Sequence, residues 1–158
     1  MKNSIKYLFF ISLFAILGFS REFFFVNVNK QLYKLYYHDS DVIIPNSLNF
    51  ITHFEYATLY YLKFPFTIVY FLAFLLTSYF AVKLICQNKK TAIWVIYIYT
   101  ILLVLSGISM AYNYVINNQL NGDEYTFSRW LMGIAQSPLV AFFMIASSKL
   151  YNKFQTEQ

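Results

Sequence analysis

The sequence predicts an all-α polytopic membrane protein, a bundle of about four transmembrane helices with a partly helical outer loop. Hydrophobic residues make up 59% of the 158 positions and charged residues only 12%, whereas soluble domains carry roughly 25% charged residues. A soluble protein of this size could not bury so much apolar surface, and a bilayer removes that difficulty. No alternating strand pattern occurs, so helices are the form that satisfies the backbone in lipid.

Four apolar stretches are the predicted spans. Each is about 20 residues or longer, the length that a helix rising about 1.5 Å per residue needs to cross about 30 Å of hydrocarbon. The spans are expected at residues 5–28, 64–86, 91–116 and 130–151. The short turn at Gln87–Lys90 makes the second and third spans an antiparallel hairpin. Pro138 should kink the fourth span, and Asn117–Ser128 forms the turn before it.

The first span has an alternative interpretation as a cleaved signal peptide. Lys2 and Lys6 precede an apolar run, and small residues follow near Ser20, as in a secretory signal. The sequence turns apolar again at Phe23–Val26. That return favours an uncleaved transmembrane helix, with residues 1–158 forming a single integral membrane domain.

The longest polar segment, about residues 29–63, is expected to form a folded outer cap. Lys30–Tyr37 places apolar side chains on one helical face and predicts a short helix lying at the membrane interface. After Pro45, Asn46 or Ser47 can cap a second helix that runs towards the membrane. Pro65 should then break or kink the junction with the second span.

The positions of lysine and arginine predict the orientation. Positive charges concentrate on the cytoplasmic side of a bacterial membrane. With the N-terminus inside, the cytoplasmic segments hold Lys2, Lys6, Lys83, Lys89, Lys90, Lys149 and Lys153. The opposite segments hold Lys30, Lys34 and Lys63. We therefore expect a multi-pass protein of the bacterial inner membrane with both termini in the cytoplasm.

Polar residues within or beside the spans form the candidate site, because a charge in lipid is costly unless it is paired or hydrated. The candidates are Arg21, Glu22, Glu55, Lys63, Asn113, Arg129 and Gln136. All fall in the outer half of the predicted topology, where Arg21 or Arg129 could hold an acidic substrate or peptide group. Alternatively, pairs such as Arg21 with Glu55 or Glu22 with Arg129 only fix the helix order, or the arginines snorkel to the interface.

Several kinds of chemistry are not expected. Cys86 is the only cysteine, so an intramolecular disulfide and a cysteine metal cage are excluded. His53 and Glu55 are two residues apart, and metal ligands on a helix come at three or four. No phosphate-binding glycine loop or nucleophile motif occurs, and the dispersed positive charges are not typical of nucleic-acid binding. We therefore expect no cofactor, no metal and no catalytic set.

Two stretches resemble a known family. They are Arg21-Glu22-Phe23-Phe24-Phe25 followed by Leu35-Tyr36-Tyr37-His38-Asp39, and Ser128-Arg129-Trp130-Leu131 followed by Gln136-Ser137-Pro138-Leu139. With the four-span layout, these stretches resemble the exosortase F system-associated proteins. The resemblance implies an accessory protein beside an exosortase, a membrane sorting enzyme similar to a transpeptidase. It implies a partner and no mechanism.

Three functional hypotheses remain from the sequence. The first is a non-enzymatic accessory or assembly protein of the envelope, which presents its outer cap to another membrane protein. The second is a small homodimeric transporter that uses Glu22 as a membrane-embedded proton or cation site. The third is an intramembrane enzyme that uses His53 or Glu55. The aromatic content of 22% is attributed mainly to codon bias and carries little functional weight.

Overall fold

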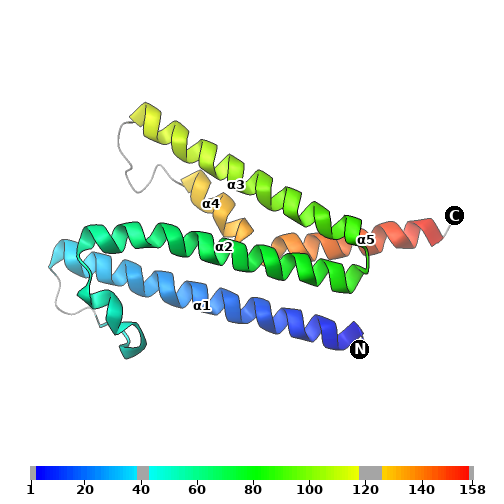
Figure 1. Cartoon of the computed structure of the whole chain (residues 1–158), viewed down its shortest axis with the longest axis horizontal. Coiled ribbons are helices and arrows are strands. Elements are labelled where there is room, and N and C mark those ends of the chain that lie inside the picture. Colours follow the sequence, from blue (N-terminus) through cyan, green and yellow to red (C-terminus); the bar gives the residue numbers. More distant parts are fainter. Residues whose placement is uncertain (1–2, 39–42, 118–125, 157–158) are drawn as a thin grey trace. The chain divides into compact units, whose positions relative to one another are not determined.

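The computed structural model describes residues 3–38, 43–117 and 126–156. Within these ranges it contains helices and no strand, which confirms the predicted all-α class. The elements, labelled in Figure 1, are α1 (Asn3–Tyr37), the 3-10 helix η1 (Asn46–His53), α2 (Tyr56–Cys86), α3 (Lys89–Asn117), α4 (Thr126–Ala135) and α5 (Leu139–Thr156).

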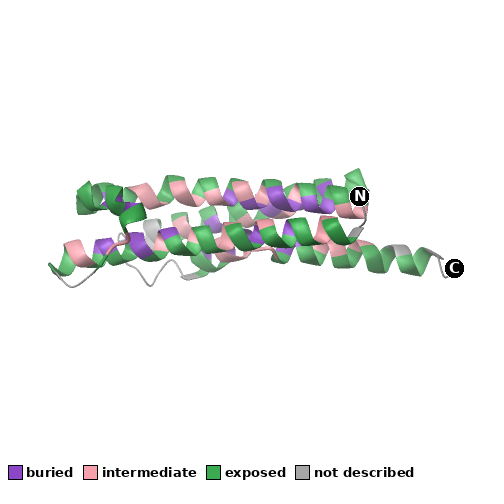
Figure 2. Ribbon diagram, turned by 90° about the horizontal axis from the view of Figure 1, so that it is seen from below, coloured by how far each residue is buried: buried purple, intermediate pink, exposed green. Residues whose placement is uncertain are grey.

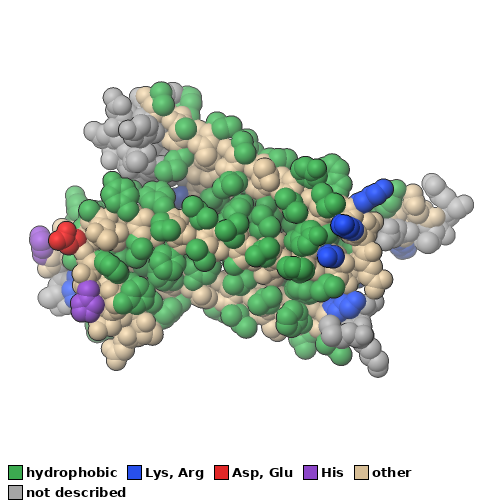
Figure 3. Space-filling model, viewed as in Figure 1, with side chains coloured by type: hydrophobic (Ala, Val, Ile, Leu, Met, Phe, Trp, Pro, Cys, Tyr) green, Lys and Arg blue, Asp and Glu red, His purple; other side chains and the backbone are tan. Residues whose placement is uncertain are grey.

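The protein is a helical membrane protein. Helices α1, α2 and α3 are each long and apolar enough to cross a bilayer, and α4 with α5 qualifies as one span with a break. Large apolar side chains stay exposed on these helices, for example Phe19 at 75% and Leu8 at 67%. Hydrophobic side chains cover much of the visible surface in Figure 3. Lipid is the solvent that such a surface requires.

The chain divides into two compact units. One unit is Ala15–Tyr70, and the other is Met1–Phe14 together with Phe71–Gln158. Helices α1 and α2 each contribute a segment to both units. Buried side chains are interspersed with exposed ones along the helices (Figure 2), as expected when a helix has one face on protein and another on lipid. Each unit is described by itself below.

The unit Ala15–Tyr70 has a hydrophobic core of its own. Phe24, Val28 and Leu32 recur every four residues and so form one face of α1. They pack in one cluster with Leu48 and Ile51 of η1 and Leu59 of α2. Ile51 and Leu59 are fully buried. Residues 43–55 are therefore folded onto the helices. They belong to the predicted outer cap of about residues 29–63, and from here on we call residues 43–55 the cap.

Two local predictions in this unit are wrong, and a third is wrong in part. The separate interfacial helix over Lys30–Tyr37 is the continuation of α1, because no proline or glycine interrupts the chain there. Neither Asn46 nor Ser47 caps η1: the N-cap position is Pro45, without a side-chain hydrogen bond. Pro65 does not break α2. The helix begins nine residues earlier, at Tyr56, and continues through the proline.

In the second unit, α2 and α3 form the expected antiparallel hairpin (Figure 1). Gln87 adopts a left-handed conformation with φ 52°. The Asn88 side-chain oxygen then accepts a hydrogen bond from the Lys90 backbone N–H at 2.9 Å, which is an N-cap for α3. The hydroxyl groups of Ser78 and Tyr99, both fully buried, lie 2.9 Å apart and join the two helices.

Helices α4 and α5 are separated by a break at residues 136–138. Their axes differ by 58°, which confirms the kink predicted at Pro138, since proline lacks the N–H that would continue the helix. Ser137 donates its hydroxyl hydrogen to the Ile134 carbonyl at 2.7 Å, and so satisfies an acceptor at the end of α4. Ser106 of α3 and Ser128 of α4 join their helices through hydroxyl oxygens 2.6 Å apart.

Candidate functional site

The unit Ala15–Tyr70 contains an open groove of about 300 Å³ between the end of α1 and the start of α2. We call it the tyrosine groove. Its walls are helical stripes, with positions 29, 33 and 37 on α1 and positions 56, 60 and 63 on α2. It is lined by Asn29, Leu32, Tyr33, Tyr36, Tyr37, Tyr56, Tyr60 and Lys63.

Aromatic rings form most of the groove wall. The ring centroids of Tyr33 and Tyr37 are 4.6 Å apart, and those of Tyr36 and Tyr56 are 5.9 Å apart across the two helices. Tyr56 also stacks on Tyr60. The side chains of Tyr33, Tyr36 and Tyr37 are more than half exposed. Such rings offer a ligand apolar contact area together with hydroxyl groups for hydrogen bonds.

Lys63 supplies the positive charge of the groove. Its ammonium nitrogen donates a hydrogen bond to the Asn29 side-chain oxygen at 2.9 Å and lies 5.6 Å from the centre of the Tyr60 ring. These contacts hold the ammonium group in one place on the groove wall. A positioned cation among tyrosine hydroxyls suits an acidic or carbonyl group of a ligand.

The other candidates in this unit do not line the groove. The Arg21 guanidinium lies 5.8 Å from the centre of the Phe25 ring, and Glu22 is exposed on α1. Ser20, next to Arg21, is level with Tyr70, because their hydroxyl oxygens are 2.8 Å apart. Glu55 precedes Tyr56, the first residue of α2, and Tyr56 is about 21 Å from Tyr70 along the helix axis. This distance excludes the predicted ion pair between Arg21 and Glu55.

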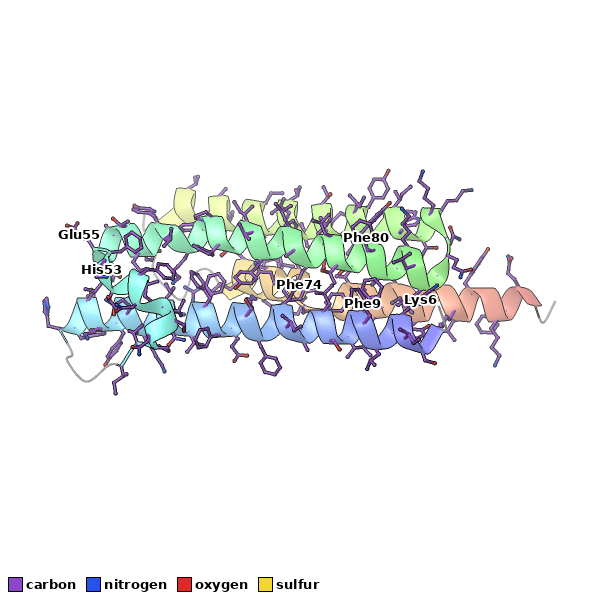
Figure 4. All side chains as sticks on the ribbon, turned by 60° about the horizontal axis from the view of Figure 1, so that its bottom comes forward. Lys6, Phe9, His53, Glu55, Phe74 and Phe80 are labelled. Atoms are coloured by element: carbon purple, nitrogen blue, oxygen red, sulfur yellow. The ribbon has the colours of Figure 1, made fainter. Side chains whose placement is uncertain are left out.

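Glu55 has a structural role at the start of α2. Its backbone carbonyl accepts a hydrogen bond from the Leu59 N–H at 2.9 Å, which opens the helix. A carboxylate at a helix N-terminus is favoured by the helix dipole. Glu55 and His53 are both exposed, and Figure 4 labels them where η1 ends and α2 begins. Within the described residues, no three His, Cys, Asp or Glu side chains gather to hold a metal ion.

The remaining candidates belong to the second unit. Arg129 is exposed on α4, whereas Gln136 is buried in the break that follows α4. The Gln136 backbone N–H donates to the Met132 carbonyl at 2.8 Å and so closes the last turn of the helix. Asn113 lies on α3, and its side chain is outside the described part of the structure. The seven predicted residues therefore fall into two sets, one in each unit.

The groove tyrosines, Asn29 and two buried amides were not predicted from the sequence. Asn27 and Gln31 are 5% and 3% exposed, and Asn27 donates to the Phe23 carbonyl at 2.7 Å. The Gln31 side-chain oxygen is buried without a hydrogen-bond partner in the described structure. A signal was present in the sequence, since Tyr33 and Tyr37, like Tyr56 and Tyr60, are four residues apart. This spacing was overlooked because the aromatic content was attributed to codon bias.

Comparison with known proteins does not add to this geometry. No family model, no curated protein and no solved structure matches the sequence. The fold and the groove define the class: a small helical membrane protein with a folded cap and an aromatic groove at the ends of two of its helices.

Proposed function

We propose that the protein is a non-enzymatic accessory or assembly protein of the bacterial envelope, and that its tyrosine groove binds another integral membrane protein. The observation that carries the proposal is the folded cap. Ile51 of η1 and Leu59 of α2 are fully buried in one core with the α1 residues Phe24, Val28 and Leu32. The helix ends that carry the groove are thereby held together by packing.

The composition of the groove favours a protein ligand. Tyrosine is enriched in protein interfaces, where its rigid ring provides contact area at a small entropy cost. The volume of about 300 Å³ is at the lower limit for small-molecule sites, which are more enclosed. An extended segment of a partner would lie along the rings, with an acidic side chain or a backbone carbonyl on Lys63.

A position of the groove at the membrane–water interface would support the same function. Helix α1 has 35 residues, about 52 Å at 1.5 Å per residue, which exceeds a hydrocarbon thickness of about 30 Å. Tyrosines are enriched at the membrane–water interface. With both termini in the cytoplasm of a bacterial inner-membrane protein, the groove would face outwards. The partner we propose is an exosortase-like sorting enzyme, as the family resemblance implies.

Site-specific photocrosslinking in native membranes tests this function. We expect a benzoyl-phenylalanine at Tyr36 to form one adduct of defined size with a membrane protein. The same probe at Tyr61, which is 67% exposed on α2 and is not part of the groove lining, is the matched control. Lys63→Gln should lower the Tyr36 adduct about tenfold, as expected for the loss of a charged hydrogen bond. Equal adducts from both positions, or an adduct insensitive to Lys63→Gln, would reject the proposal.

A further inference from the structure

The unit of Met1–Phe14 and Phe71–Gln158 contains a second cavity, of about 160 Å³, which we call the apolar crevice. Three helices contribute to it. The α1 positions 7, 10, 11 and 14 and the α5 positions 142, 145 and 146 each form one helical face. The lining residues are Tyr7, Phe10, Ile11, Phe14, Ala81, Ile85, Phe142, Ile145 and Ala146.

Lysines stand at one end of the apolar crevice. Lys149 follows Ala146 by three residues, so it continues the lining face of α5. Its ammonium nitrogen lies 4.7 Å from the centre of the Tyr7 ring, and Tyr7 itself lines the crevice. Lys6, labelled in Figure 4 near the start of α1, donates to the Leu84 carbonyl of α2 at 3.1 Å. Both ammonium groups thus lie beside residues of the crevice wall.

All charged side chains at this end of the crevice are positive among the described residues. Lys6, Lys83, Lys149 and Lys153 belong to helices of this unit, and Lys89 and Lys90 begin α3. Figure 3 shows a group of Lys and Arg side chains near the α2–α3 turn. The described residues of this unit, 3–14, 71–117 and 126–156, include no Asp or Glu. Among these residues no carboxylate is therefore available to pair with Lys6 or Lys149, the two lysines at the crevice wall.

We propose that the apolar crevice, with Lys149 and Lys6 at its end, binds an anionic phospholipid. One acyl chain would lie in the crevice, and the phosphate would be held by Lys149 with help from Lys6. An apolar cavity is not a site for water, and an empty one loses dispersion contacts along its wall. The acyl chain is the apolar group that a membrane supplies. Basic pockets between transmembrane helices are suited to acidic headgroups, and lysine binds phosphate as a point charge.

Lys149 is the residue to test, because Lys6 also satisfies a carbonyl at the end of α2. The full chain would be reconstituted in nanodiscs that contain equal amounts of phosphatidylglycerol and phosphatidylcholine. The lipids that stay bound after extraction would then be counted by native mass spectrometry. We expect retention of phosphatidylglycerol, and about fivefold less retention in Lys149→Gln, the effect of about 1 kcal/mol per lysine at a membrane surface. Lys90→Gln, with the same charge change on an exposed side chain, should retain it normally.

A second variant tests the acyl chain. Ala146→Phe places a ring in the crevice and should abolish retention while both lysines are kept, whereas Leu150→Phe, at a 58% exposed position of α5, should not. Circular dichroism would verify that helix content is unchanged. Equal retention of the two lipids, equal losses in Lys149→Gln and Lys90→Gln, or full retention in Ala146→Phe would overturn the proposal.

Discussion

At the scale of single residues, hydroxyl pairs connect helices whose surfaces are otherwise apolar. The Ser78–Tyr99 pair joins α2 to α3, and the Ser106–Ser128 pair joins α3 to α4. In lipid, the hydrophobic effect does not drive helices to associate. Hydrogen bonds of this kind and close packing therefore determine which helices pack together. Each bond contributes about 0.6 kcal/mol on average in membrane proteins. These hydrogen bonds therefore contribute mainly to the choice of which helix faces pack against each other.

The two members of the Ser78–Tyr99 pair should not be equivalent when removed. A serine hydroxyl in a helix can turn to the carbonyl four residues before it, so Tyr99→Phe should destabilise by only about 0.5 kcal/mol. Ser78→Ala leaves the buried Tyr99 hydroxyl group without a hydrogen-bond partner, because a tyrosine hydroxyl cannot turn to a carbonyl of its own helix. This substitution should lower the free energy of unfolding by about 1–3 kcal/mol. Unfolding free energies in mixed detergent micelles measure both. Tyr97→Phe, at a 57% exposed position of α3, is the control, and a larger cost for Tyr99→Phe than for Ser78→Ala would contradict this view.

The sequence identified which residues are unusual in lipid but not which of them meet. Lys63 was a candidate because a charge near a span is conspicuous, and it lines the groove. Asn29, its hydrogen-bond partner, was missed because the pair depends on the register of α1 against α2. Arg21 and Glu55 were placed together by topology alone, and their separation along the helices excludes their pairing. Register is set by tertiary packing, which hydropathy does not record.

At the scale of elements, the centres of the membrane helices were predictable and their ends were not. Hydropathy reports the segment that must lie in hydrocarbon, and α2 contains its predicted span of residues 64–86. The helix nevertheless starts at Tyr56, because Leu59 and its neighbours pack with the cap. A proline can also be accommodated: Pro65 is inside α2, and the residues that precede it in the helix are held in place by protein contacts.

The cap should open when its anchor is removed. Ile51→Ala deletes a fully buried side chain, and this type of substitution costs about 2–5 kcal/mol. We expect the amides of residues 46–53 to exchange at least about 30-fold faster with deuterium in micelles. The amides in the middle of α3 should not change. Phe50→Ala, at a 46% exposed position of the same 3-10 helix, serves as the control, and equal exchange in both variants would show that the cluster does not hold the cap.

At the scale of the whole molecule, the number of crossings depends on the broken pair α4–α5. The 10 residues of α4 and the 18 residues of α5 rise about 15 Å and 27 Å, so neither alone covers about 30 Å of hydrocarbon. The apolar part of α5 is shorter still, since Lys149 and Lys153 occupy its second half. The two helices can cross only together, as one broken span. The predicted fourth span of residues 130–151 corresponds to these two helices, and whether they cross as one broken span or re-enter sets the number of crossings.

Labelling of single cysteines, introduced into a Cys86→Ser chain, tests this topology. They would be placed at His53, Asn88 and Gln155, which are all exposed, and labelled in intact cells with a membrane-impermeant maleimide. If α4 and α5 form one crossing, Asn88 and Gln155 lie on the same side, because two spans separate them. With both termini in the cytoplasm, only the cysteine at His53 should react. Reaction at both His53 and Gln155 would mean that the α4–α5 pair re-enters without crossing. Reaction at Asn88 and Gln155 alone would keep four crossings and reverse the orientation, which would place the tyrosine groove in the cytoplasm.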